Sequence, residues 1–151
     1  MAFKINIGTK TGKTYKLENE SQALIGRELN QIINGEDISS DLKGYEFEIR
    51  GTSDFAGFTS LDSVEGVGLK KVLLSYEKGM KKRPKYEGKK KRSNPKPKGL
   101  RLRKTVRGKE ISTAITQINL KVVKQGEKSL KEIFEKKEKV EEKKEWKKST
   151  L

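Results

Sequence analysis

Apolar and polar residues alternate along several stretches of the chain, and this spacing predicts β-strands with one buried face. The alternation runs over residues 3–7 and again over residues 45–49. After a turn around Gly12 it continues at Tyr15 and Leu17, which predicts a hairpin with the first strand. Further strands are expected over residues 71–76, at Leu100 and Leu102, and over residues 114–123, where Ala114, Thr116, Ile118, Leu120 and Val122 face one way.

Residues 23–33 follow a different spacing, which is typical of an amphipathic helix. Asn19 or Ser21 can cap the start of this helix, and Asn34 followed by Gly35 can end it. The face that would pack on the body consists of four residues: Ile25, Leu29, Ile32 and Ile33.

A second helix is predicted near the C-terminus, where Ser129 and Glu132 have the spacing of a capping box. Leu130, Ile133 and Phe134 form a short apolar stripe, so the first turns are expected to pack on the body. The Lys- and Glu-rich remainder is expected to form a solvated helix.

Several short strands with one short helix predict a mainly β (α+β) fold. We expect a small β-barrel-like body, an extended basic arm and a C-terminal helix. Residues 1–126 would form the body, with the arm at about 80–104, and residues 127–151 would form the Lys/Glu-rich extension.

Charge is distributed very unevenly along the 151 residues, whose net charge is +15. Residues 80–110 contain 15 basic and 2 acidic residues, together with all three prolines of the chain, whereas residues 1–79 contain 10 basic and 12 acidic residues. Proline and like-charge repulsion favour an extended backbone, and an extended strip of cations fits a polyphosphate. The predicted RNA contacts are Lys81, Lys82, Arg83, Lys85, Lys89, Lys90, Lys91, Arg92, Lys96, Lys98, Arg101, Arg103, Lys104 and Arg107.

Three other interpretations of the basic segment remain open. It can be a solvated lysine-rich loop, although so many cations repel one another unless a polyanion screens them. It can be attracted to anionic lipid, although it lacks the apolar face of an interfacial helix. It can also serve a general nucleic-acid-binding protein that compacts DNA or acts as an RNA chaperone. Within it, Tyr86 either stacks on an unpaired base or packs on its neighbours.

The composition argues against an enzyme, because the chain has no cysteine and no histidine. Disulfides, thiolate chemistry and a Ser-His-Asp triad are therefore excluded, and no catalytic residue, cofactor or metal site is expected. Asp54 lies in a motif-like stretch, residues 51–58, but is expected to cap a turn rather than to catalyse. No apolar run is long enough to span a bilayer or form a secretory signal, so a cytoplasmic location is expected.

Several blocks of sequence resemble, in the right order, ribosomal protein six of the small subunit in eukaryotes and archaea. They are residues 44–45, 49–54 and 57–58, then 72–75, 103–108 and 118–126, and the Lys-Thr-Val-Arg-Gly block at 104–108 is the most specific. The chain departs from the family at Thr52, where glycine is common, and at Thr59 and Ser60, where the family has Pro-Met. The serine-rich tail of the eukaryotic members is missing, as in an archaeal form.

The resemblance implies a structural constituent of the small ribosomal subunit, located in the cytoplasm. Its partners would be small-subunit rRNA and neighbouring ribosomal proteins, with no membrane and no obligate homo-oligomer. Arg103, Lys104 and Arg107 lie in a matched block, and the resemblance therefore implies that they contact RNA.

Overall fold

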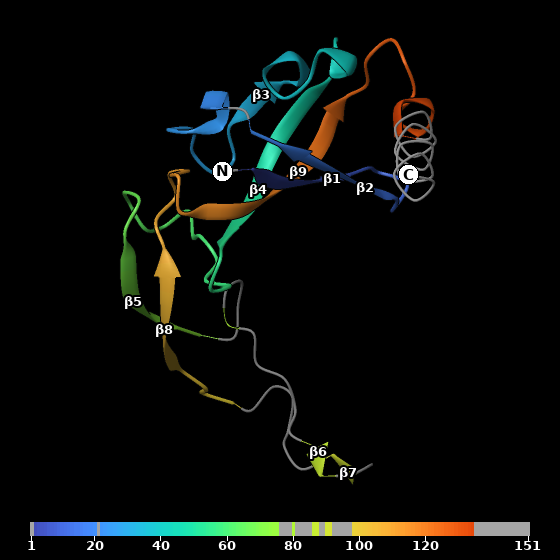
Figure 1. Cartoon of the computed structure of the whole chain (residues 1–151). Coiled ribbons are helices and arrows are strands. Elements are labelled where there is room, and N and C mark those ends of the chain that lie inside the picture. Colours follow the sequence, from blue (N-terminus) through green and yellow to red (C-terminus); the bar gives the residue numbers. More distant parts are fainter. Residues whose placement is uncertain are drawn as a thin grey trace, which may run out of the picture.

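A five-stranded mixed sheet forms the body in the computed structural model, which describes residues 2–20, 22–75, 80, 86–87, 90–91 and 98–134 (Figure 1). Its strands lie in the order β2-β1-β9-β4-β3. The parallel pair is β1 with β9, and the other neighbours are antiparallel. The bounds are β1 Phe3–Gly8, β2 Thr14–Asn19, β3 Ile32–Asn34, β4 Glu46–Asp54 and β9 Ile115–Lys124.

The mainly β class is therefore confirmed, and so are the first hairpin and the strand around Phe47. Phe3, Ile5 and Ile7 are buried on one face of β1, as the alternation predicts. The sheet is open rather than barrel-like, because β2 and β3 lie at its two edges in the described part of the chain.

Strand β9 confirms the longest predicted strand, but its side chains do not alternate regularly. Ile118, Leu120 and Val122 are buried as expected, whereas Ala114 is exposed and Ile115 is buried in its place. Its pairing with β4 shifts register between Ser53 and Asp54, so the pattern of buried residues slips by one position there.

The helix predicted over residues 23–33 is wrong. A 3-10 helix, η1 (Gln22–Leu24), is followed by turns and then by β3. Gly26 and Asn30 have positive φ angles of 82° and 65°, which a right-handed helix does not allow. The backbone N–H groups of Gly26 and Leu29 donate to the carbonyls of Ile111 and Lys109, so long-range hydrogen bonds replace those of a helix.

The main core lies between the sheet and the segments that cover it. Phe47, Ile49 and Ile118 are fully buried in it, and two further 3-10 helices contribute Gly35 and Leu42 to the buried residues. These helices are η2 (Gly35–Asp37) and η3 (Ser40–Leu42).

Residues 130–134 are helical, and they pack beside the edge strand β2 (Figure 1). The Ser129 hydroxyl accepts a hydrogen bond from the Glu132 N–H at 3.3 Å, as the capping pattern predicts. The ring of Phe134 stacks on Tyr15 with 4.9 Å between ring centroids. The expected packing of the first turn is therefore confirmed, whereas the Lys- and Glu-rich remainder, residues 135–151, lies outside the described residues. None of the described helices is long and apolar enough to cross a membrane.

A two-stranded antiparallel ribbon extends from the body and is built from β5 (Leu69–Leu74) and β8 (Leu102–Arg107) (Figure 1). It confirms both predicted strands, although Leu100 precedes the start of β8. Leu61, Val64 and Val106 form a second, smaller core against one face of the ribbon. Beyond the ribbon, β6 (Tyr86–Glu87) pairs with β7 (Lys90–Lys91).

Candidate nucleic-acid interface

The β5–β8 ribbon carries the best-described part of the basic segment. Arg101 and Arg103 are exposed, while Lys104 is half-buried. Directly opposed residues of antiparallel strands share a face, so Arg103 lies beside Leu73, and Lys104 lies beside Val72 on the opposite face. The second face also carries Val106, which packs into the small core. The ribbon therefore exposes Arg103 to solvent on one face, and Lys104 lies beside the small core on the other.

The ion pairs of the described residues involve none of Lys98, Arg101, Arg103 and Lys104. By contrast, Lys109 lies just after the ribbon and pairs with Glu28, with 3.1 Å between Nζ and Oε2. Four of the predicted RNA contacts are thus cations that the body does not neutralise, and a phosphate could do so.

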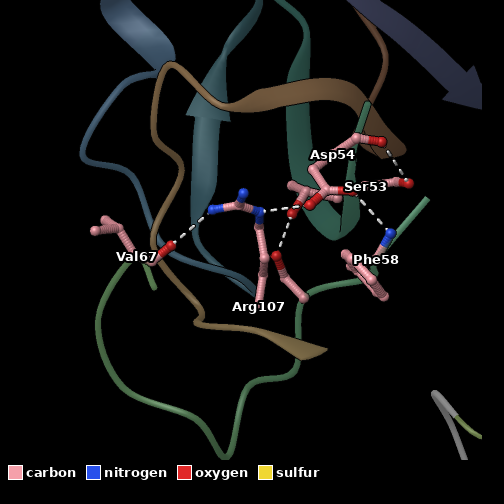
Figure 2. A network of polar contacts seen from close by, with 7 residues as sticks. Ser53, Asp54, Phe58, Val67 and Arg107 are labelled. Carbon is pink, nitrogen blue, oxygen red and sulfur yellow. Dashed lines mark hydrogen bonds and ion pairs between the residues drawn. The ribbon is translucent and has the colours of Figure 1, made fainter. Parts of the chain in front are cut away.

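Arg107 differs from these cations because it is held inside the protein. Its Nε donates to Oδ2 of Asp54 at 2.8 Å, and its Nη1 donates to the Val67 carbonyl at 3.1 Å (Figure 2). The two side chains are only 16% and 5% exposed. Because both bonds reach segments far away in the sequence, Arg107 fastens the ribbon to the end of β4.

Asp54 has the turn-capping role that was expected of it. Its Oδ1 accepts a hydrogen bond from the Phe58 N–H at 2.8 Å (Figure 2). Its own carbonyl accepts from the Gly57 N–H at 3.0 Å. Gly57 has a φ of 88°, a conformation that favours glycine. One carboxylate therefore closes the turn and at the same time pairs with Arg107.

The electrostatic balance at Asp54 keeps its carboxyl ionised. Burial acts to raise its pKa, but the Arg107 hydrogen bond, the Phe58 N–H and the Arg107 charge outweigh burial. The pKa of Asp54 therefore lies below its ordinary value. This arrangement stabilises an ion pair at neutral pH and gives Asp54 a structural role in the turn.

The other predicted contacts can be located only in part. The backbones of Lys90 and Lys91 form β7, and Lys98 is exposed next to a turn. The remaining predicted contacts lie outside the described residues: Lys81, Lys82, Arg83, Lys85, Lys89, Arg92 and Lys96.

One cation that the sequence reasoning did not include shares the solvent-facing side of the ribbon. Lys71 is exposed on β5 and pairs with Thr105, two residues along β8 from Arg103. Its position follows from the pairing register of two strands that are about 30 residues apart in sequence. The proximity of Lys71 to Arg103 could have been predicted only from this pairing register.

Comparisons with known proteins give one consistent family. The family described as ribosomal protein S6e matches residues 3–135. The chain is 40% identical over 125 residues to small ribosomal subunit protein eS6 of Methanocaldococcus jannaschii, which covers 83% of this chain and 84% of that protein. It is 42% identical over 127 residues to the protein of the same name from Methanococcus maripaludis strain C7, covering 83% and 90% of the two chains. The protein of that name from Archaeoglobus fulgidus is 38% identical over 144 residues, covering 91% and 99%.

Proposed function

Because the chain belongs to the ribosomal protein S6e family, we propose that it is a structural constituent of the small ribosomal subunit that binds rRNA mainly through phosphate contacts from its basic segment. The observation that carries the proposal is the family match over residues 3–135, which includes that segment. The contacts would be made by the fourteen residues that the sequence predicts, with Arg107 contributing chiefly by fastening the ribbon.

The geometry of the described residues supports phosphate contacts at the ribbon. Arg101, Arg103 and Lys71 are exposed, and guanidinium groups bind phosphate oxygens with two parallel hydrogen bonds. The Asp54–Arg107 pair and the small core fix the ribbon against the body, so the backbone that carries these cations is positioned by the fold. Phosphate contacts of this kind set position and affinity rather than sequence preference.

The proposal includes the organisation and setting of the chain. Residues 1–126 form the body with its arm, and residues 127–151 form an extension. The protein works in the cytoplasm as part of the ribosome, next to other ribosomal proteins, and it is neither an enzyme, a membrane protein nor an obligate homo-oligomer. Its relatives support this because each bears the name of a small-subunit ribosomal protein.

The salt dependence of RNA binding tests the phosphate contacts. If about six phosphates are neutralised, a fourfold rise in salt lowers the affinity on the order of a thousandfold. Replacing Arg101, Arg103 and Lys104 by alanine should flatten the plot of log affinity against log salt by about two to three contacts. A slope equal to that of the wild-type protein would contradict the proposed role of the ribbon.

A matched triple variant controls for net charge. Lys4, Lys16 and Lys43 are exposed lysines of the body outside the basic segment, and their replacement by alanine removes the same three charges. This control should change the slope of log affinity against log salt by less than the loss of one phosphate contact would. In addition, competition with duplex DNA separates rRNA binding from general nucleic-acid binding, because equal affinity for both would favour a DNA-compacting or RNA-chaperone protein.

A further inference from the structure

A cavity of about 280 Å³ lies where the turn between β1 and β2 meets the end of β9 and the start of the C-terminal helix. Figure 1 shows that this helix stands beside β2, on the side of the sheet away from the β5–β8 ribbon. The cavity shares no residue with the basic segment. It is lined by Thr9, Lys10, Thr11, Tyr15, Tyr45, Val122, Val123, Gln125, Ser129, Leu130 and Lys131.

The chemistry of this lining is selective. The half-buried ring of Tyr15 and the 41% exposed side chain of Val123 provide apolar walls, behind which Tyr45, Val122 and Leu130 are buried. Thr11 and Gln125 add a hydroxyl and an amide. Lys10 and Lys131 are exposed cations of the lining, and none of the lining residues is acidic. An apolar cavity with a few polar groups and a positive side fits a ligand that has a flat ring and an anionic group.

We infer that this cavity binds a single nucleotide, with the base between Tyr15 and Val123 and the phosphate near Lys10. A simple anion would not need the apolar walls, and an apolar ligand would not need the cations. The volume lies just below the roughly 300–1,000 Å³ of typical ligand pockets, which suits one nucleotide rather than a longer stretch. The nucleotide can be an unpaired residue of RNA or a free mononucleotide, since both have the same chemistry.

Packing contacts within the protein hold the aromatic side chains around the cavity in place. Tyr45 is 3% exposed, and its hydroxyl donates to the Lys128 carbonyl. A Cβ atom at Gly126 would lie 2.6 Å from Cδ2 of Tyr45, so glycine there lets the chain pass directly against the ring. Stacking on Phe134 likewise fixes the ring of Tyr15. A preformed wall lowers the ordering cost of binding.

Two surfaces of one protein would therefore contact nucleic acid in different ways. The ribbon and basic segment would bind phosphates along a backbone, whereas the cavity would hold one base with its phosphate. Stacking on aromatic side chains is the usual way in which proteins recognise unpaired RNA bases. The inference goes beyond the proposed phosphate contacts, since it depends on the cavity alone.

An NMR titration of the full-length protein tests the inference with adenosine monophosphate as the probe. We expect amide shifts at Thr9, Lys10, Gln125 and Ser129 that saturate with one site. Adenosine should shift the same amides with at least threefold weaker affinity because it lacks the phosphate. Shifts confined to other residues, or equal shifts from inorganic phosphate alone, would overturn the inference.

Three variants assign the binding to the cavity. Lys10→Ala should lower the affinity for adenosine monophosphate at least threefold and leave the affinity for adenosine unchanged. Lys13→Ala removes an exposed lysine of the same turn that lies outside the lining, and it should change neither affinity. Val123→Trp places a large ring in the cavity at a residue that is 41% exposed. It should abolish the binding of both ligands, while its melting temperature stays within a few degrees of the wild-type value. Equal losses in the two lysine variants would show nonspecific attraction and refute the site.

A single-stranded hexanucleotide distinguishes the two sources of nucleotide. If RNA supplies it, the hexanucleotide shifts the cavity amides at lower concentration than the monophosphate does; a free mononucleotide site gives the reverse order. If neither ligand shifts them, the inference is wrong. The ribbon variant in which Arg101, Arg103 and Lys104 are replaced by alanine should bind adenosine monophosphate with the affinity of the wild-type protein, because none of these residues lines the cavity. A failure of the cavity inference can therefore be told apart from a failure of rRNA binding through the ribbon.

Discussion

The ion pair between Asp54 and Arg107 should be one of the most important polar contacts of this fold, and Asp54→Ala is the direct test. The substitution removes the partner of Arg107 Nε and the acceptor of the Phe58 N–H, both at 2.8 Å. Arg107 is only 16% exposed and would be left without its counter-charge. Removing one partner of a buried pair costs about 3–5 kcal/mol of unfolding free energy. That loss is a large fraction of the about 5–15 kcal/mol that stabilises a typical domain.

A matched control lies on the same strand. Glu46 pairs with Lys124 at 3.2 Å, but these side chains are 36% and 67% exposed. Glu46→Ala should therefore cost only about 0–1 kcal/mol, since solvent screens exposed pairs. Urea unfolding followed by circular dichroism gives both values under one set of conditions. Equal losses in the two variants would refute the structural role assigned to Asp54.

The double variant Asp54→Ala with Arg107→Ala makes the test independent of whether Asp54→Ala folds well. Removing both partners leaves no uncompensated charge, so the double variant should be more stable than the sum of the single losses predicts, by about 1–3 kcal/mol. Additive losses would mean that Arg107 and Asp54 do not interact in the folded protein.

Three further predictions concern stability. Because the pKa of Asp54 is lowered in the folded protein, its carboxylate adds to the free energy of unfolding above the ordinary aspartate pKa of about 4, and this stabilisation is lost as the pH falls through the lower folded value. Unfolding free energies measured between pH 6 and 2.5 should show the loss. Asp54→Asn should lack this part of the pH dependence. Phe47→Ala, at a fully buried site, should cost about 3–5 kcal/mol, whereas Phe55→Ala, at a ring that is 94% exposed, should stay within about 0.5 kcal/mol in the same urea assay. Gly108→Ala places a Cβ 1.7 Å from the Gly66 carbonyl oxygen and should lower the melting temperature by about 4 °C or more, and an unchanged melting temperature would show that this contact is not tight.

Alternation was sufficient to predict strands whose residues face the main core. Phe3, Ile5 and Ile7 are buried because one face of β1 lies on that core, and period two describes such a strand directly. On β9 the same pattern failed at one end, where the register shift against β4 buries Ile115 instead of Ala114. A register shift depends on two paired strands, so the pattern of one strand alone does not reveal it.

The predicted helix over residues 23–33 failed for a different reason. Its apolar spacing is real, but Leu29 and Ile33 reach the core from turns and a short strand, while Ile32 is 57% exposed. Hydrogen bonds from Gly26 to Ile111 and from Asn30 to Ile49 stabilise that path. The local spacing of apolar residues cannot predict hydrogen bonds between residues that are so far apart in sequence.

The candidate interface was predictable as a charge segment but not residue by residue. The charge pattern groups Arg103 with Arg107, yet the fold exposes Arg103 and holds the half-buried Arg107 against Asp54, 53 residues earlier. The same folding brings Lys71 beside the exposed arginine. Charge predicts a polyanion as the partner, but only the contact between Arg107 and Asp54 in the folded protein separates the structural arginine from the exposed one.

Crosslinking in assembled small subunits tests the proposed function most directly. A photoreactive residue in place of Arg103 should form crosslinks to small-subunit rRNA nucleotides, because this side chain is exposed on the ribbon proposed to face phosphates. The same group in place of Lys16, which is exposed on β2, serves as the comparison and should crosslink to RNA much less. Crosslinks from position 103 only to proteins, or no difference between the two positions, would contradict rRNA binding through the basic segment.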